Sequence, residues 1–120
     1  MLAKEGRITT SRDFRRVYRS GNKKSGRFLK LYYLVNKHGS TRFGYSISKK
    51  VGKAVIRNRL KRRLRAICRQ HLASFQPGID VVLVARERAV DASYGELEKE
   101  VLNLSRGEKI LVNGESEPLG

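Results

Sequence analysis

Residues 46–65 read SISKKVGKAVIRNRLKRRLR, and the organisation of the chain follows from this stretch and its surroundings. From residue 54 to about residue 75, apolar side chains recur at steps of three and four, which predicts one long amphipathic helix. The apolar side of this helix comprises Ile56, Leu60, Leu64, Ile67 and His71. Beside it, a polar arc of about 140° on the helical wheel carries Arg57, Asn58, Lys61, Arg62, Arg65 and Arg69.

The basic helix lies in a part of the chain that contains no acidic residue. Between Asp13 and Asp80 there is no Asp or Glu, and the formal net charge of the 120 residues is +16. Solvated surfaces normally mix both signs of charge, and like charges four residues apart destabilise a helix. We therefore expect the basic side of this helix to bind a polyanion, because the planar guanidinium group of arginine grips phosphate with two hydrogen bonds.

The segments before the basic helix are a helix and strands. A capping-box pattern and helical spacing predict a helix over residues 11–20, followed by a polar basic loop over 21–26. Aromatic and β-branched residues predict a strand over 27–35. A turn over 36–39 leads to an alternating strand over 41–47, and we expect these two strands to form a hairpin.

The segments after the basic helix complete one domain. The apolar run over 79–85 is typical of a central strand covered on both faces, and a capping box at Ser93 begins a final amphipathic helix. We expect a single α+β domain over 1–106, folded as an α/β sandwich, and a flexible tail over 107–120. Two or three strands precede the basic helix; with three, the order is helix-strand-strand-strand-helix-strand-helix.

Some classes of protein are excluded by what the sequence lacks. The single cysteine, Cys68, borders the apolar arc, so we expect it to be buried and we exclude an internal disulfide. No apolar run is long enough to span a membrane, and the first residues lack the apolar core of a signal peptide. We therefore expect a cytoplasmic protein. A membrane-surface protein is disfavoured, because the apolar side of the basic helix lacks interfacial aromatic residues.

A protein nuclease would need a general acid and base, or a cluster of metal ligands. His38 falls in the expected turn and His71 on the apolar arc, and the segments that flank them offer no partner carboxylate. A surface position and core packing are therefore the favoured interpretations of these histidines. No acidic cluster could hold two metal ions either, so we expect neither a catalytic residue nor a metal site in the protein.

Four blocks of the sequence resemble, in the same order, those of one family. Residues 49–62, KKVGKAVIRNRLKR, resemble the signature of the bacterial ribonuclease P protein, whose Arg-Asn-Arg motif matches Arg57, Asn58 and Arg59. The other matching blocks are RDFRRVYRSG at 12–21, FGYSIS at 43–48 and DVVLVAR at 80–86.

The resemblance implies a fold and an activity. The fold is an α/β sandwich, of a type also found in a ribosomal protein domain, with a rare left-handed βαβ crossover around the basic helix. The implied activity is that of a non-catalytic subunit: ribonuclease P RNA, with Mg²⁺, removes the 5′ leader of precursor tRNA. The partners would be that RNA and precursor tRNA. The residues facing the catalytic RNA would be Arg57, Asn58, Arg59, Lys61, Arg62, Arg65 and Arg69.

The resemblance also places the single-stranded leader in a cleft between the first helix and the sheet. Phe14 and Tyr18 match its aromatic positions, with Phe28 or Tyr32 on the neighbouring strand, although Phe14 fits a core stripe equally well. Aromatic rings stack on unpaired bases without demanding a sequence, while cations follow the backbone. The further leader-binding residues would be Ser48, Lys49, Lys50, Lys53 and Arg86.

Two other nucleic-acid-binding functions remain as alternatives. A ribosomal or other structural RNA-binding protein would have similar charge and a similar type of fold. A DNA-binding helix could contact guanines through Arg59 and Arg63, but neither a dimer pattern nor a turn-helix pattern accompanies these residues.

Overall fold

Strand β4, Ile79–Ala85, lies inside a four-stranded sheet because its side chains are buried on both faces. The computed structural model describes residues 6–112. Within them, β4 pairs antiparallel with β2, Leu29–Val35, and parallel with β3, Arg42–Ser46. The predicted central strand is thereby confirmed.

The sheet order β1-β2-β4-β3 corrects two expectations about the strands. Asn22–Ser25, expected to be a loop, forms the edge strand β1, which pairs antiparallel with β2. The expected hairpin between β2 and β3 is wrong, because β4 lies between them. Consecutive strands usually pair, but a strand that is apolar on both faces is buried best with a neighbour on each side.

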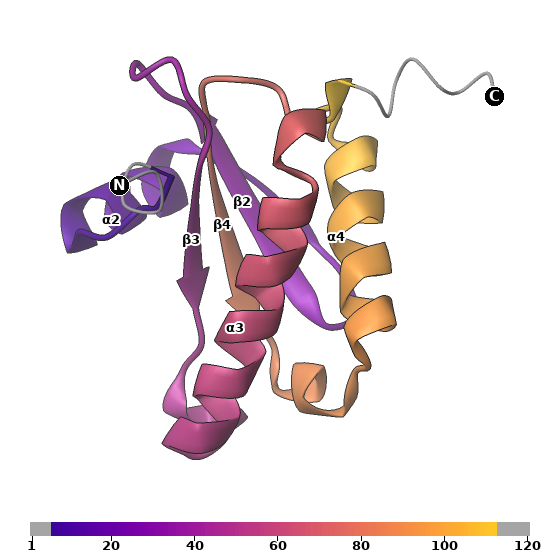
Figure 1. Ribbon diagram of the computed structural model, residues 1–120. Coiled ribbons are helices and arrows are strands. Elements are labelled where there is room, and N and C mark those ends of the chain that lie inside the picture. Colours follow the sequence, from indigo (N-terminus) through magenta and orange to yellow (C-terminus); the bar gives the residue numbers. More distant parts are fainter. Residues whose placement is uncertain (1–5, 113–120) are drawn as a thin grey trace, which may run out of the picture.

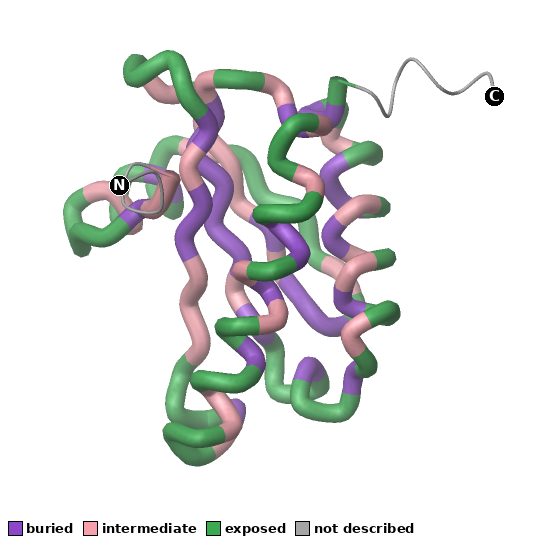
Figure 2. The backbone as a smooth tube through the Cα atoms, viewed as in Figure 1, coloured by how far each residue is buried: buried purple, intermediate pink, exposed green. Residues whose placement is uncertain are grey.

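Helices cover both faces of the sheet (Figure 1). Helix α2, Ser11–Ser20, packs on one face through the fully buried Val17. Helices α3, Ala54–Gln70, and α4, Tyr94–Gly107, cover the other face and enclose the larger part of the core. Figure 2 shows buried backbone along the strands and the inner sides of α3 and α4, with exposed residues on their outer sides. The predicted α/β sandwich is confirmed.

The crossover from β3 through α3 to β4 is left-handed. In Figure 1 both strands point downward, β4 lies to the right of β3, and α3 passes in front of them. About 98% of such crossovers in proteins are right-handed. The arrangement confirms the expectation drawn from the family resemblance.

Capping bonds set the ends of the helices. The N–H of Asp13 donates to Thr10 Oγ1 over 3.1 Å at the start of α2, and Ser93 with Glu96 forms the predicted capping box of α4. Helix α3 ends at Gln70 rather than near residue 75. Short 3₁₀ turns η1, η2 and η3 occupy Lys49–Val51, Leu72–Ser74 and Glu87–Asp91.

Strand β2 begins two residues later than expected because a carboxylate binds the backbone before it. The carboxylate of Glu100 on α4 accepts the N–H groups of Arg27, Phe28 and Leu29 over 3.0, 2.8 and 2.7 Å. A Cβ atom at Gly26 would lie 2.5 Å from the same carboxylate, so a larger residue here would displace the Glu100 side chain from this position. Glu100 thereby ties the start of β2 to α4.

The domain continues past the boundary that we expected at residue 106. Ile110 and Leu111 are buried, and Leu111 forms an isolated β-bridge with Phe75. The hydroxyl of Tyr33 donates to Glu108 over 3.0 Å. The expectation of a tail is therefore corrected for residues 107–112, and its remaining part, 113–120, lies outside the described residues.

Candidate RNA-binding surfaces

Three aromatic side chains lie together on the sheet face that α2 covers, and we call Phe14, Tyr18 and Tyr32 the aromatic row. The ring centroids of Phe14 and Tyr18 are 6.3 Å apart, and those of Tyr18 and Tyr32 are 4.9 Å apart in an edge-to-face arrangement. Tyr18 is 38% exposed, while Phe14 and Tyr32 are half-buried. The row therefore offers ring surface to a ligand from both a helix and a strand.

Phe14 also packs tightly against the sheet. A Cβ atom at Gly44 of β3 would lie 2.9 Å from the Phe14 ring, so α2 approaches the sheet here only because residue 44 is glycine. Phe14 belongs to the small core around Val17 and Val82. It therefore serves the core and the aromatic row together, and Tyr18 is the more accessible ring.

Phe28, predicted as an alternative to Tyr32, does not join the aromatic row. It is 8% exposed and belongs to the core cluster on the α3 and α4 side of the sheet, with the Arg27 guanidinium carbon 5.1 Å from its ring centroid. The alternation of a strand does not extend to Phe28, because β2 begins only at Leu29. Of the two candidates, the structure brings Tyr32 to the row.

The buried Asp80 holds α2 in position over the sheet. Its carboxylate accepts hydrogen bonds from Arg42 Nε and Nη2 over 2.9 and 2.7 Å, from Asn36 over 2.8 Å and from Arg16 over 3.3 Å. Burial alone would raise the pKa of Asp80, but these hydrogen bonds outweigh it, so the pKa lies below its usual value. Sequence reasoning missed this cluster because its members come from four separate segments.

Cations gather at the end of the sheet where the parallel strands β3 and β4 have their C-termini. Lys49 and Lys50 in η1 follow β3 and are exposed, as is Lys53. Ser48 accepts the N–H of Lys50 over 3.3 Å, which caps this turn. Arg86 follows β4 and donates to the carbonyl of Gly26 over 2.8 Å. These five predicted leader-binding residues lie at one end of the sheet because the C-termini of parallel strands lie on the same side.

Two further lysines accompany the aromatic row, and sequence reasoning missed them. Lys23 on β1 lies opposite Tyr32, and Ser25 lies opposite Lys30. Directly opposed residues of paired strands project to the same face. The Lys23 and Lys30 side chains therefore share the face of the row. The polar composition of residues 22–25 concealed this strand, and with it the face of Lys23.

The second candidate surface is the basic face of α3, which comprises Arg57, Asn58, Lys61, Arg62, Arg65 and Arg69. Asn58, Lys61, Arg62 and Arg69 are exposed, and Arg57 Nη1 donates to the carbonyl of Gly52 over 3.3 Å. Arg65 is half-buried, and its Nε has no hydrogen-bond partner within residues 6–112. The predicted face thus lies on one helix, and four of its six side chains are exposed to solvent.

Arg59, although central in the Arg-Asn-Arg motif, lies on the other flank of α3. It lines a hollow of about 170 Å³ between α3 and η3, together with Ile56, Leu60, Arg63, Ala89 and Val90. Arg65 and Arg69 instead lie beside Tyr45 of β3. Of the three residues of the motif, Arg59 alone lines this hollow.

Cys68 and Tyr45 form a buried contact beneath the basic face. Cys68 is 1% exposed, as predicted, and burial raises the pKa of its thiol to about 12, against a smaller opposing effect of its hydrogen bond with Tyr45. Burial also raises the pKa of Tyr45. The thiol is therefore protonated at neutral pH, which makes it a poor nucleophile.

The histidines lie away from both candidate surfaces. His71 Nε2 is 2.6 Å from Glu98 Oε2 on α4 and the residue is half-buried, which corrects the expectation that it packs in the core. The pair was missed because Glu98 is 27 positions away along the chain. His38 is exposed in the predicted turn, where its N–H donates to Asn36 Oδ1 over 2.9 Å. His71 bridges α3 and α4 and therefore has a structural role.

The described part of the chain contains neither a candidate metal site nor a candidate membrane-spanning helix. It contains no group of three or more His, Cys, Asp and Glu that could hold a metal ion. Among the same residues, no helix combines the length and the apolar character needed to cross a membrane.

Comparison with known proteins agrees with this geometry. The sequence model of the Ribonuclease P family matches residues 2–107. The ribonuclease P protein component of Syntrophomonas wolfei is 44% identical over 106 residues, which cover 88% of this chain and 89% of the relative. That of Desulforamulus reducens is 49% identical over 87 residues, covering 72% and 77%.

Solved structures give the same result. The RNase P protein of Staphylococcus aureus superposes with a TM-score of 0.81 at 30% identity, covering 88% of this chain and 96% of that one. The RNase P protein of Thermotoga maritima superposes with a TM-score of 0.77 at 27% identity, covering 83% and 96%.

The left-handed crossover, the aromatic row and the basic face of α3 define an α/β RNA-binding protein of the kind that accompanies a structured RNA. The chain belongs to the ribonuclease P protein family. It is a protein component of ribonuclease P and acts in tRNA processing, and the alternative of a ribosomal protein is not favoured.

Proposed function

We propose that this protein is a non-catalytic subunit, which docks on the catalytic RNA through the basic face of α3 and holds the 5′ leader of precursor tRNA on the aromatic row. The observation that carries the proposal is the separation of these two surfaces. Tyr18 and Tyr32 lie on the α2 side of the sheet, and Arg62 lies on the helix that covers the other side. One protein can therefore contact two RNA molecules at once.

The aromatic row suits an unpaired strand of any sequence. Stacking of a base on an aromatic side chain stabilises a complex by about 1–3 kcal/mol. Lys23, Lys30, Lys49 and Lys50 are placed to follow the phosphates, and no hydrogen-bonding pattern for a particular base is required. Leaders differ in sequence between precursor tRNAs, so this chemistry fits the substrate class.

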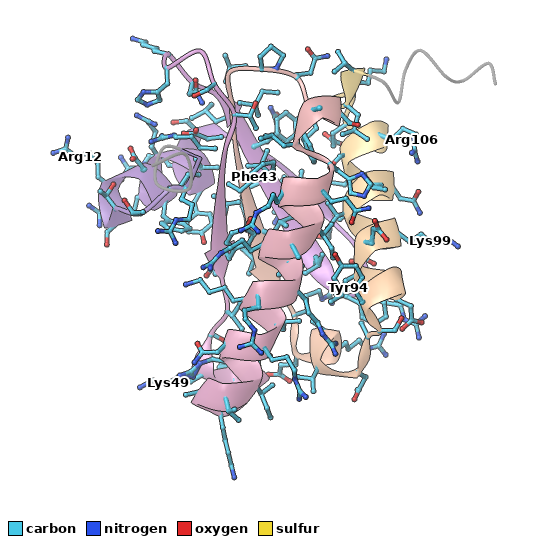
Figure 3. All side chains as sticks on the ribbon, in the orientation of Figure 1. Arg12, Phe43, Lys49, Tyr94, Lys99 and Arg106 are labelled. Atoms are coloured by element: carbon cyan, nitrogen blue, oxygen red, sulfur yellow. The ribbon has the colours of Figure 1, made fainter. Side chains whose placement is uncertain are left out.

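The basic face of α3 suits a folded RNA. Its cations are displayed by a regular helix, and Figure 3 shows Lys49 projecting at the foot of the same helix. Neutralising phosphates releases counterions, so assembly should weaken with salt, with a log–log slope of about −4 to −5 if some six phosphates are neutralised.

Catalysis is assigned to the RNA subunit. The described residues include no group of acids and histidines that could hold a metal ion, and His71 bridges α3 and α4 through Glu98. The described residues do not fit a protein-held metal, so we assign the Mg²⁺ of the holoenzyme to the RNA. A cytoplasmic location is proposed because the lone cysteine is reduced and buried.

Reconstitution tests the proposal. Adding the protein to a bacterial ribonuclease P RNA at low Mg²⁺ should restore removal of the 5′ leader, because the protein cations replace part of the Mg²⁺ that screens RNA against RNA. Lys99→Gln on α4 is a matched control, since this exposed cation projects away from both surfaces (Figure 3). Absence of stimulation with a cognate RNA would overturn the proposal.

A further inference from the structure

We propose that the outer face of α2, formed by Arg12, Arg15, Arg16 and Arg19, binds phosphates of the leader beyond the aromatic row. The inference rests on the proposed leader binding and extends its path. It assigns a binding role to a side of α2 that neither proposed surface includes.

Three of the four arginines of this face lack internal neutralisation. Asp13 is the acid on α2, and its carboxylate is already shared by Arg16 at 3.4 Å and Arg42 at 3.5 Å. Arg12, Arg15 and Arg19 are exposed, and their side chains make no hydrogen bond or ion pair with any residue of the described range 6–112. Like charges three and four residues apart destabilise a helix, so an external anion would stabilise this one.

The four arginines are arranged around a common hollow. Together with Ser20 they line a depression of about 230 Å³ on the outer side of the helix. Arg16 is held in place by its 3.3 Å contact with Asp80, so one guanidinium group of the hollow is preorganised. At 1.5 Å per residue, Arg12 and Arg19 are about 10 Å apart along the axis, which is long enough to contact more than one phosphate.

The face is continuous with the aromatic row. Residues three and four apart are neighbours on a helix surface, so Arg15 lies next to the exposed Tyr18 and Arg19 lies next to Arg15. A strand that stacks on Tyr18 and leaves the row over α2 meets these guanidinium groups next. Figure 3 shows Arg12 projecting from α2 away from the rest of the domain, open to such a strand.

An ordinary solvated face would mix its charges, as α4 does. There Lys99 stands among Glu96, Glu98 and Glu100. The charged residues on the outer face of α2 are all arginines, which favours binding of a phosphate backbone over exposure to solvent alone.

The experiment compares two leader lengths in the reconstituted holoenzyme. One precursor tRNA carries a leader of the few nucleotides that the aromatic row can hold, and the other carries a leader several nucleotides longer. The variant is the triple change Arg12→Gln, Arg15→Gln and Arg19→Gln, which keeps Arg16 and uses a residue of similar helix propensity. The control triple, Lys99→Gln, Arg106→Gln and Lys109→Gln, removes the same charge from α4 and its C-terminal end.

The wild-type holoenzyme should bind the long-leader precursor more tightly than the short-leader one. The α2 triple variant should bind the long-leader precursor about tenfold more weakly than the wild type and the short-leader precursor equally well. Because the variant removes three guanidinium groups from the path of the phosphates, the log–log salt slope for the long leader should fall by about 2 in magnitude. The control triple should leave the length dependence unchanged.

Two outcomes would overturn the inference. Equal losses of affinity for both leaders would mean that the arginines attract RNA only through their general positive charge. Unchanged affinity for the long leader would mean that this face contacts solvent and not the leader. Both outcomes leave the wild-type preference for precursor over mature tRNA intact, whereas failure of the proposed function would abolish that preference already in the wild-type holoenzyme. Circular dichroism and thermal unfolding verify that the triple variant folds.

Discussion

Tyr18 and Tyr32 meet edge to face, with ring centroids 4.9 Å apart, and they connect helix α2 to strand β2 on the sheet face that α2 covers. Tyr18 keeps 38% of its surface exposed in this contact. The pair therefore combines a fixed geometry with an accessible ring, which a stacking site for unpaired bases requires.

Tyr18→Ala should weaken holoenzyme binding of precursor tRNA by about 1–3 kcal/mol, because one stacking ring is removed. Affinity for mature tRNA, which has no leader, should stay unchanged. Dissociation constants for the two tRNAs, measured side by side, give the result. Tyr18→Phe keeps the ring and should bind like the wild type, and an equal loss for mature tRNA would place Tyr18 outside the leader path.

Arg62→Gln should weaken assembly with the catalytic RNA while leaving the preference for precursor over mature tRNA intact. The exposed guanidinium group neutralises phosphate, so its removal should lower the magnitude of the log–log salt slope by about 1. Titration of the RNA with protein at several salt concentrations measures this slope. A loss of leader preference without a loss of assembly would show that the two surfaces are not separate.

Asp80→Asn should destabilise the domain by about 3–5 kcal/mol, because it removes the nearer counter-charge of the largely buried Arg42 and leaves only Asp13 at 3.5 Å. Thermal or urea unfolding of the isolated protein measures the change. Asp91→Asn, at an exposed position in η3, is the control and should unfold like the wild type. A change below about 1 kcal/mol would mean that the Asp80 cluster is not what holds α2 on the sheet.

Acid should destabilise the protein through the same carboxylate. The pKa of Asp80 is lowered in the folded state, so its contribution is fully present above the unfolded-state pKa of about 3.9 and is lost as the pH falls below it. Unfolding free energies measured between neutral pH and acid should show this loss. The Asp80→Asn protein should have a flatter pH dependence, and an identical slope in both proteins would contradict the assignment.

Cys68 should resist alkylation in the native protein. It is 1% exposed and burial raises its pKa to about 12, so the reactive thiolate is scarce near pH 8. Iodoacetamide labelling followed by mass spectrometry should show modification only after denaturant is added. Rapid labelling of the folded protein would mean that α3 separates readily from β3.

The accuracy of sequence reasoning differed between elements for physical reasons. Helix α3 and strand β4 were predicted well because their apolar periodicity records burial directly. The order with three strands before α3 is confirmed, but the position of β1 was missed, since its four exposed polar residues form a strand only through pairing with β2. The false hairpin arose because adjacency along the chain says nothing about a strand that inserts later.

Charge pattern, helical periodicity and the Arg-Asn-Arg motif, all local properties, were enough to indicate a basic helix, a polyanion partner and the family. Long-range packing was needed for the rest. It selected Tyr32 over Phe28, brought η3 beside Arg59 and gathered the partners of Asp80 from distant segments. Such choices depend on which chain segments become neighbours, and the burial of β4 between β2 and β3 determines that for the whole sheet.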